Sequence, residues 1–140
     1  MKALLLLATV GVVMSGQSEA PVAGTWIAQH NGRTFIRLQL DGVPGAFKGG
    51  ITLGNIEFDK TGAVGKAGDP PPVLKPIVPV AQKAGVVAFL VESSEDPDRF
   101  EFRLIDASRA ELRLVLSEDQ RDELAEMGIP ALKPIPLRKQ

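Results

Sequence analysis

An alternation of apolar and polar side chains on both sides of one Asn-Gly pair constrains the fold of this chain more than any other feature. A period of two residues is typical of a strand with one buried face, and Asn-Gly favours the type I′ turn of a tight hairpin. The sequence therefore predicts two antiparallel strands joined at Asn31-Gly32, with Phe35 on the outer face of the second strand. The expected inward row is Trp26, Ala28, Thr34, Ile36, Leu38 and Leu40.

Further short runs with this pattern follow, and turns rich in Gly, Asp and Ser separate them. Seven or eight such strands with one helix predict an all-β fold, a small antiparallel up-and-down barrel with one short C-terminal helix. A β-sandwich is the alternative. The further runs lie at residues 47–53, 56–58, 86–92, 100–105 and 111–116. The expected core aromatic residues are Trp26, Phe47, Phe58, Phe89, Phe100 and Phe102.

One helix is predicted over residues 117–128. Ser117 and Gln120 have the spacing of a capping box, in which each side chain binds the backbone N–H of the other residue. Gly128 is typical of the residue that follows a helix. The apolar face consists of Leu124 and Met127 only, so we expect the helix to pack lightly on the barrel rim.

Two proline-spaced segments interrupt the pattern. Proline removes a backbone donor and favours extended polyproline geometry. Residues 67–80 are therefore predicted to form a surface excursion or a poorly paired edge, and residues 129–140 a proline-spaced tail. Residues 74–77, Leu-Lys-Pro-Ile, recur at 132–135, which we interpret as a coincidence of composition and not as a repeat.

The N-terminal residues have the order of a secretory signal peptide. Lys2 gives a positive start, residues 3–14 are uncharged and mostly apolar, and residues 15–20 are small and polar. The apolar run of twelve residues is shorter than the roughly 20 that span a bilayer. We therefore expect residues 1–20 to be cleaved and residues 21–140 to be one β-rich domain, periplasmic or secreted. Pro21 leaves the point of cleavage open.

Charge and cysteine content limit the kinds of partner. The formal net charge is −1 and the basic residues do not cluster. The composition therefore gives no electrostatic basis for binding nucleic acid, nor a polybasic segment that would hold the mature chain on a membrane. The chain contains no cysteine, which excludes disulfides. The oligomeric state stays open.

Candidate catalytic and metal-binding residues are few, and each has a simpler interpretation. His30, the single histidine, directly precedes the predicted hairpin turn and is interpreted as a solvated turn residue. The acidic residues Glu95, Asp96 and Asp98 share one turn but lack the ligand spacing of a calcium loop. We interpret that turn as a solvated hairpin connection.

Three glutamates, Glu92, Glu101 and Glu111, fall on adjacent predicted strands. A carboxylate pair for glycoside chemistry would need two of them to face inward. Glu101 and Glu111 lie opposite the apolar rows, beside arginines, so outward cross-strand ion pairs explain them better. The sequence therefore assigns no catalytic, cofactor-binding or metal-binding residue.

Gly24-Thr25-Trp26, at the start of the first predicted strand, resembles the opening of the calycin barrels, the lipocalins and avidins. The likeness to the avidin type continues through Gln29, residues 34–36, Asp41-Gly42 and Gly45. It implies a barrel in which Trp26 plugs one end. It does not extend to biotin binding, because Ala28 replaces a polar ligand-binding residue and the chain has no Tyr and a single Trp. The whole chain resembles small exported bacterial barrel domains of unassigned function.

The sequence thus favours an exported, non-catalytic binding or interaction module. Such a barrel could hold a small, mostly apolar ligand at the mouth distal to Trp26. The alternative is an accessory protein that docks a partner through an exposed strand edge or a proline-rich segment. A hydrolytic enzyme is the class with the least support. Whether residues 74–80 pack against the barrel distinguishes the first two classes.

Overall fold

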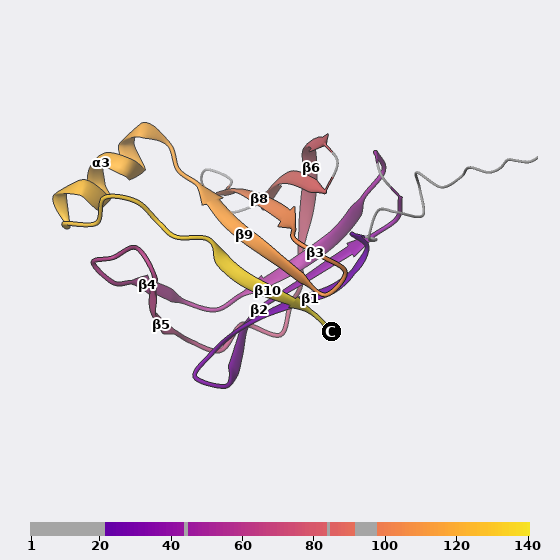
Figure 1. The fold of residues 1–140 in the computed structure, drawn as a ribbon, viewed down its shortest axis with the longest axis horizontal. Coiled ribbons are helices and arrows are strands. Elements are labelled where there is room, and N and C mark those ends of the chain that lie inside the picture. The colour runs from indigo at the N-terminus through magenta and orange to yellow at the C-terminus, as the bar shows by residue number, and fades with distance from the viewer. Residues whose placement is uncertain (1–21, 44, 84, 92–97) are drawn as a thin grey trace, which may run out of the picture.

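The computed structural model describes residues 22–43, 45–83, 85–91 and 98–140, so the predicted signal peptide, Glu92, Glu95 and Asp96 lie outside the described residues. Eight antiparallel strands form a closed barrel in the order β1-β10-β9-β8-β7-β6-β3-β2 (Figure 1). The barrel strands are β1 (Gly24–His30), β2 (Arg33–Asp41), β3 (Lys48–Leu53), β6 (Lys75–Lys83), β7 (Val86–Val91), β8 (Asp98–Leu104), β9 (Arg109–Val115) and β10 (Ile135–Lys139).

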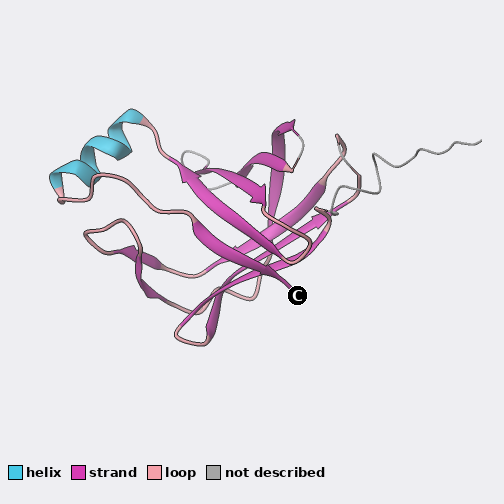
Figure 2. Cartoon of the chain, viewed as in Figure 1, coloured by secondary structure: helices cyan, strands magenta, loops and turns pink. Residues whose placement is uncertain are grey.

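Two insertions stand outside the ring. A two-stranded ribbon of β4 (Ile56–Phe58) and β5 (Val64–Ala67) separates β3 from β6, and the helix α3 (Glu118–Glu126) separates β9 from β10. Figure 2 shows both insertions at the same end of the molecule. Despite the insertions, every barrel strand pairs with the next barrel strand along the chain, and β10 closes the ring against β1. The predicted all-β barrel with one helix is therefore confirmed, and the sandwich alternative is wrong.

The first hairpin forms as predicted, with one correction. Asn31 and Gly32 have φ values of 53° and 79°, as a type I′ turn requires. The register shifts between Ala28 and Gln29, so one extra residue of β2 has no partner opposite it. Because of this bulge, Phe35 turns inward and is 3% exposed, whereas Thr34 is only half-buried.

Side chains fill the interior of the barrel. Every barrel strand contributes buried apolar side chains to one cluster, as expected for eight strands, whose ring is just wide enough to be packed solid. Trp26 meets Phe102 edge-on with ring centroids 5.2 Å apart, and its indole N–H donates to the carbonyl oxygen of Val22 at 2.9 Å. Phe89 and Phe100 stack at 5.7 Å.

Five of the six predicted core aromatic residues are buried: Trp26, Phe47, Phe89, Phe100 and Phe102. The prediction for Phe58 is wrong, because this residue is half-buried and outside the core cluster. It belongs to β4, which pairs with β5 and not with a barrel strand.

Both proline-spaced segments contain a barrel strand that their proline content did not predict. Lys75–Lys83 forms β6, so the predicted excursion over 67–80 ends at residue 74. Ile135–Lys139 forms β10, which pairs with β9 and β1 and closes the ring in what was predicted to be a tail. Proline keeps the extended geometry of a strand and only removes a donor, and in β6 the register shifts just after Pro79.

The recurring Leu-Lys-Pro-Ile segment leads into a strand in both places. Ile77 of β6 and Ile135 of β10 are each 6% exposed and belong to the core cluster. The two copies therefore both place their isoleucine in the core, but β6 already includes Lys75 and Pro76, whereas β10 begins at Ile135.

The capping box of α3 is confirmed. The Ser117 hydroxyl accepts from the backbone N–H of Gln120 at 3.2 Å, and the Gln120 side chain accepts from the backbone N–H of Ser117 at 2.9 Å. Gly128 follows with φ +83°. Leu124 is half-buried and Met127 is 64% exposed, and α3 has no buried residue. Across the described ranges, no helix combines the length and the apolar character that crossing a membrane requires.

Candidate functional site

Of the acidic and histidine candidates from the sequence, the structure describes four, which lie on β1, β8 and β9: His30, Asp98, Glu101 and Glu111. His30 lies at the end of β1, with its ring edge-on to Phe35 at 6.4 Å. Glu101 faces Arg113 across the sheet, and Glu111 faces Arg103. The ion pair of Glu101 is with Arg103 at 3.7 Å, two residues along the same strand, so it does not cross between strands as predicted. In the part of the chain that the structure describes, no three His, Asp or Glu residues are placed to hold a metal ion.

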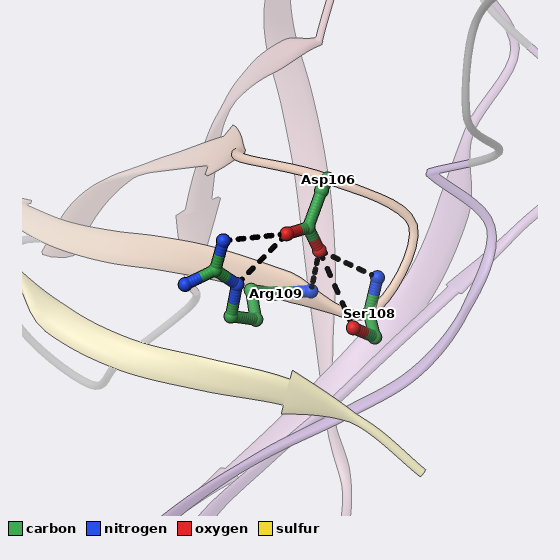
Figure 3. Close-up of polar contacts among 3 residues, drawn as sticks. All are labelled: Asp106, Ser108 and Arg109. Carbon is green, nitrogen blue, oxygen red and sulfur yellow. Dashed lines mark hydrogen bonds and ion pairs between the residues drawn. The ribbon is translucent and has the colours of Figure 1, made fainter.

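Among the described carboxyl groups, Asp59 and Asp106 have lowered pKa values, and both stabilise turns. In the β8–β9 turn, hydrogen bonds from the Arg109 side chain and from the Ser108 backbone lower the pKa of Asp106 to about 2 (Figure 3). The guanidinium Nε of Arg109 and the backbone N–H of Ser108 lie 2.8 and 2.9 Å from the carboxylate. Hydrogen bonds from the Thr61 side chain and backbone similarly lower the pKa of Asp59 in the β4–β5 turn. These groups hold hairpins and do not point to proton transfer.

The filled interior directs the search for a ligand site to the outside of the barrel. There, a cleft of about 340 Å³ lies beside the second half of β9, and we call it the β9 cleft. It is lined by Glu101, Arg113, Leu114, Val115, Leu116, Arg121, Leu124, Pro130, Ala131, Leu132 and Lys133.

The β9 cleft exists because the chain diverges from β9. Pairing between β9 and β10 ends at Leu112 and Ile135, whereas pairing between β9 and β8 continues to Val115. Beyond that point the chain leaves the barrel to form α3 and returns through residues 130–134 on its way to β10 (Figure 1). One edge of residues 113–115 is therefore left without a neighbouring strand.

Contacts with the β4–β5 turn hold the returning segment away from β9. The backbone N–H of Lys133 donates to the carbonyl oxygen of Gly62 at 2.9 Å. The carbonyl oxygen of Ala131 lies against Gly62 so closely that a Cβ there would overlap it. Gly62 also has φ +86°, a conformation that side chains disfavour. This turn thus fixes the far wall of the cleft.

The alternation of hydrogen-bonded and non-hydrogen-bonded residue pairs between β8 and β9 shows which backbone groups of β9 face the open edge. In an antiparallel pair, residues that exchange hydrogen bonds alternate with residues whose backbone groups point away from each other. Leu104, paired with Ala110, is of the second kind, because its N–H donates instead to Gly85 of the neighbouring hairpin at 2.7 Å. Leu114 lies four residues after Ala110 in an unbroken register. Its N–H and C=O therefore point away from β8, toward the cleft.

Three cations and one carboxylate line the β9 cleft: Arg113, Arg121, Lys133 and Glu101. The helix α3 carries five carboxylates and one arginine, yet Arg121 is its one charged residue in the lining. Neither Arg113 nor Arg121 makes a side-chain hydrogen bond or ion pair with any described residue. Lys133 lies close enough to Asp59 to contribute to its lowered pKa. The lining is therefore electropositive.

Apolar side chains occupy the remainder of the lining. Leu114, Leu116, Leu124 and Leu132 are all half-buried, and they come from β9, the segment after it, α3 and the returning segment. The cleft thus combines an open strand edge, apolar contacts and positive charge.

A second open edge occurs on β6, but the chain obstructs it. Only Lys75 and Pro76 of β6 pair with β3. Beyond them, Pro79 offers no N–H, and the Gln82 side chain accepts a hydrogen bond from the backbone N–H of Gly45 at 2.5 Å. Prolines and covering loops are the usual protection of an edge against further strands.

Residues 74–80 pack down against the barrel. The Leu74 side chain lies over Gly50, where a Cβ would stand 2.6 Å from Leu74 Cγ, and Ile77 is in the core. Val78 and Val80 remain 46% and 43% exposed. The proline-rich segment is therefore part of the barrel wall and not a detached docking peptide.

Sequence reasoning missed the β9 cleft because its walls come from segments interpreted separately. Arg113 was assigned to an outward ion pair, Leu124 to the barrel rim, and Leu132 and Lys133 to a tail. The repeated Leu-Lys-Pro-Ile segment was the available signal, since it marks the return of the chain to the barrel at residue 135.

Comparison of the chain with models of protein families, with curated proteins and with solved structures found no match.

Proposed function

We propose that this protein is an exported, non-catalytic interaction module that binds an extended segment of a partner protein in the β9 cleft. The observation that carries the proposal is the backbone of Leu114, whose N–H and C=O point to the edge of β9 without a neighbouring strand. Backbone groups in a partly covered position need hydrogen-bond partners. An incoming strand supplies them, as in other cases of strand addition to a sheet edge.

The size of the cleft supports a short segment. An open edge of three residues is about 10 Å long at roughly 3.3 Å per residue. The cleft volume of about 340 Å³ lies in the range of ordinary ligand sites. The helix α3 and residues 130–133 flank the open edge of β9. The edge can therefore pair with one short strand, and the flanking segments oppose the addition of further strands to the sheet.

The other function classes have less support. A small apolar ligand inside the barrel would have to displace side chains of the core cluster. Metal-dependent catalysis lacks support among the described residues, because no three His, Asp or Glu residues are placed to hold a metal ion. Docking through the edge of β6 is opposed by Pro79 and by the Gln82–Gly45 hydrogen bond.

The proposal also includes export of the protein and a likeness of its barrel to the calycins. Residues 1–20 support export through their signal-peptide pattern. Gly24-Thr25-Trp26 at the start of β1, together with the closed eight-stranded barrel, supports a likeness to the calycins. The filled interior agrees with a function that does not use a central cavity.

The decisive experiment uses the acetylated and amidated peptide Asn-Leu-Asn-Leu-Asn and the mature protein. Hydrogen exchange of the Leu114 amide should slow when the peptide binds, whereas exchange of Leu112, whose N–H is directed to β10, should not change. Two peptides methylated on the backbone nitrogens of either the leucines or the asparagines serve as controls. One of the two must lose binding, because a single row of donors faces β9. Unchanged Leu114 exchange, or equal binding by both methylated peptides, would contradict the proposal.

A further inference from the structure

We infer that the β9 cleft selects an acidic segment, in which carboxylates alternate with apolar side chains. This inference rests on the proposed function and specifies the chemistry of the partner. It starts from the lining, where three cations face one carboxylate.

Arg113 is the cation nearest to an added strand. It belongs to the open part of β9, and a residue directly opposite it would have its Cβ within about 4.5–5.5 Å. The cross-strand neighbour of Arg113 on the other side is Glu101, whose ion pair is with Arg103 at 3.7 Å and not with Arg113. The guanidinium of Arg113 therefore retains its donors for a carboxylate of a bound segment, and its planar fork matches carboxylate geometry.

Arg121 and Lys133 also line the cleft, and they come from two other segments of the chain. Arg121 comes from α3 and Lys133 from the returning segment. Lys133 already lies near the carboxylate of Asp59, whereas Arg113 and Arg121 make no ion pair with a described residue. The two arginines are therefore the cations more available to a bound carboxylate. Carboxylates on a bound segment would thus lie among cations that come from β9, α3 and the returning segment.

The leucines of the lining define the apolar half of the pattern. Successive side chains of a strand point to opposite faces, so a bound segment with acidic residues toward one face presents the intervening residues to the other. Leu116, Leu124 and Leu132 are half-buried and gain cover from apolar side chains there. Alternation of acidic and apolar residues therefore fits the cleft better than a uniformly acidic run.

The acidic helix acts against this preference but does not reverse it. The five carboxylates of α3 would repel an acidic segment, yet none of them lines the cleft. At physiological ionic strength, charges separated by more than about 8 Å are largely screened. Carboxylates of α3 beyond that distance therefore oppose binding only weakly. Glu118, three residues before Arg121 on the helix, lies nearer to Arg121, so we expect Arg113, on the barrel, to contribute most to the preference.

The test compares three acetylated and amidated pentapeptides: Asp-Leu-Asp-Leu-Asp, Asn-Leu-Asn-Leu-Asn and Lys-Leu-Lys-Leu-Lys. The acidic peptide should bind about tenfold more tightly than the neutral one, a difference of about 1.4 kcal/mol, and the basic peptide more weakly than both. Added salt should reduce the affinity of the acidic peptide much more than that of the neutral one. Titration calorimetry measures these differences.

Single substitutions test which arginines cause the preference for the acidic peptide. Arg113→Gln and Arg121→Gln should each reduce the affinity for the acidic peptide several-fold, with the folded barrel verified by circular dichroism. Arg138→Gln is the matched control, because Arg138 lies on β10 opposite Arg109, outside the cleft, and should leave the affinity unchanged.

The outcomes separate the two proposals. Equal affinities for the acidic and neutral peptides, both with slowed Leu114 exchange, would overturn the acidic preference and leave strand addition intact. If no peptide binds, strand addition itself fails. If sodium octanoate binds in the cleft while the peptides do not, the site serves a small anion and both proposals are wrong.

Discussion

The carbonyl oxygen of Ala131 lies directly against Gly62, in the space that any other residue at that position would fill with its Cβ. This contact joins the returning segment to the β4–β5 turn, and the adjacent hydrogen bond from Lys133 to Gly62 reinforces it. Two parts of the chain that are far apart in sequence thereby set the width of the β9 cleft.

Replacing Gly62 by alanine should therefore destabilise the protein and alter the cleft. The left-handed conformation alone costs about 1–2 kcal/mol for a residue with a side chain, and the overlap with Ala131 adds to this cost. Urea unfolding measures the total. Gly32→Ala is the matched control, because Gly32 has φ +79° but open space around it. An equal loss in both variants would show that the contact with Ala131 contributes nothing.

Truncation of Phe102 should have a large effect on stability. Phe102 is fully buried against Trp26, so Phe102→Ala should lower the free energy of unfolding by about 3–5 kcal/mol. Phe58→Ala should cost clearly less, because Phe58 is half-buried and outside the core cluster. An unchanged unfolding midpoint for Phe102→Ala would refute the strand register, and the midpoints of both variants can be read from the same urea titration.

Acid should weaken the β8–β9 turn through Asp106. Its pKa in the folded protein is about 2, below the ordinary value of 3.8, so the ionised form favours folding. This contribution is present above about pH 4 and is lost as the pH falls toward 2. The gap in unfolding free energy between the wild type and Asp106→Asn should therefore narrow over that interval. A gap that stays constant from neutral pH to pH 2 would contradict the assignment.

Removing the cap of α3 should affect the helix more than the barrel. Ser117→Ala deletes the side-chain half of the capping box, a change that typically costs about 1 kcal/mol of helix stability. Because α3 has no buried residue, the global free energy of unfolding should change much less. Hydrogen exchange of the α3 amides should accelerate while the amides of β7 and β8 stay protected. Uniform acceleration in the helix and the barrel would mean that the two unfold together.

Processing of the N-terminus can be tested by mass. Protein produced with its own N-terminal residues should be recovered outside the cytoplasm without about the first 20 residues, as the signal-peptide pattern predicts. Intact mass spectrometry identifies the first residue, and substitution of arginine for Leu5 in the apolar run serves as the control that blocks export. Recovery of the full-length mass in the exported fraction would refute the prediction.

Local patterns predicted the parts of the fold that local physics decides. Asn31-Gly32 and the Ser117–Gln120 pair specify their turn and cap through their own backbone and side-chain bonds. The position of Phe35 was mispredicted because a bulge depends on the opposite strand. Phe58 was mispredicted because alternation identifies a shared face but not the sheet to which a strand belongs.

Local patterns also did not predict the proline-containing strands β6 and β10 or the β9 cleft, because all of these depend on contacts between distant segments. Pro76 and Pro136 lower the local preference for a strand, yet pairing with Gly50 and Glu111 compensates in the folded barrel. The cleft depends on the divergence of β10 from β9, which the contact between Gly62 and Ala131 maintains. The residue pattern of β9 itself does not predict that divergence.

Closure of the ring by β10 has a consequence for the order of folding. β1, which begins the ring, pairs on one side with β10, so Trp26 lies opposite Lys139. During synthesis the first strands therefore leave the ribosome long before their second neighbour exists. The nascent chain cannot complete its barrel until residues 135–139 have been made, and contacts between such distant residues make this step slow. A chain with this topology cannot close its barrel before residues 135–139 have been made, and a chain whose barrel is still open is closer to the unfolded state that a translocation channel accepts.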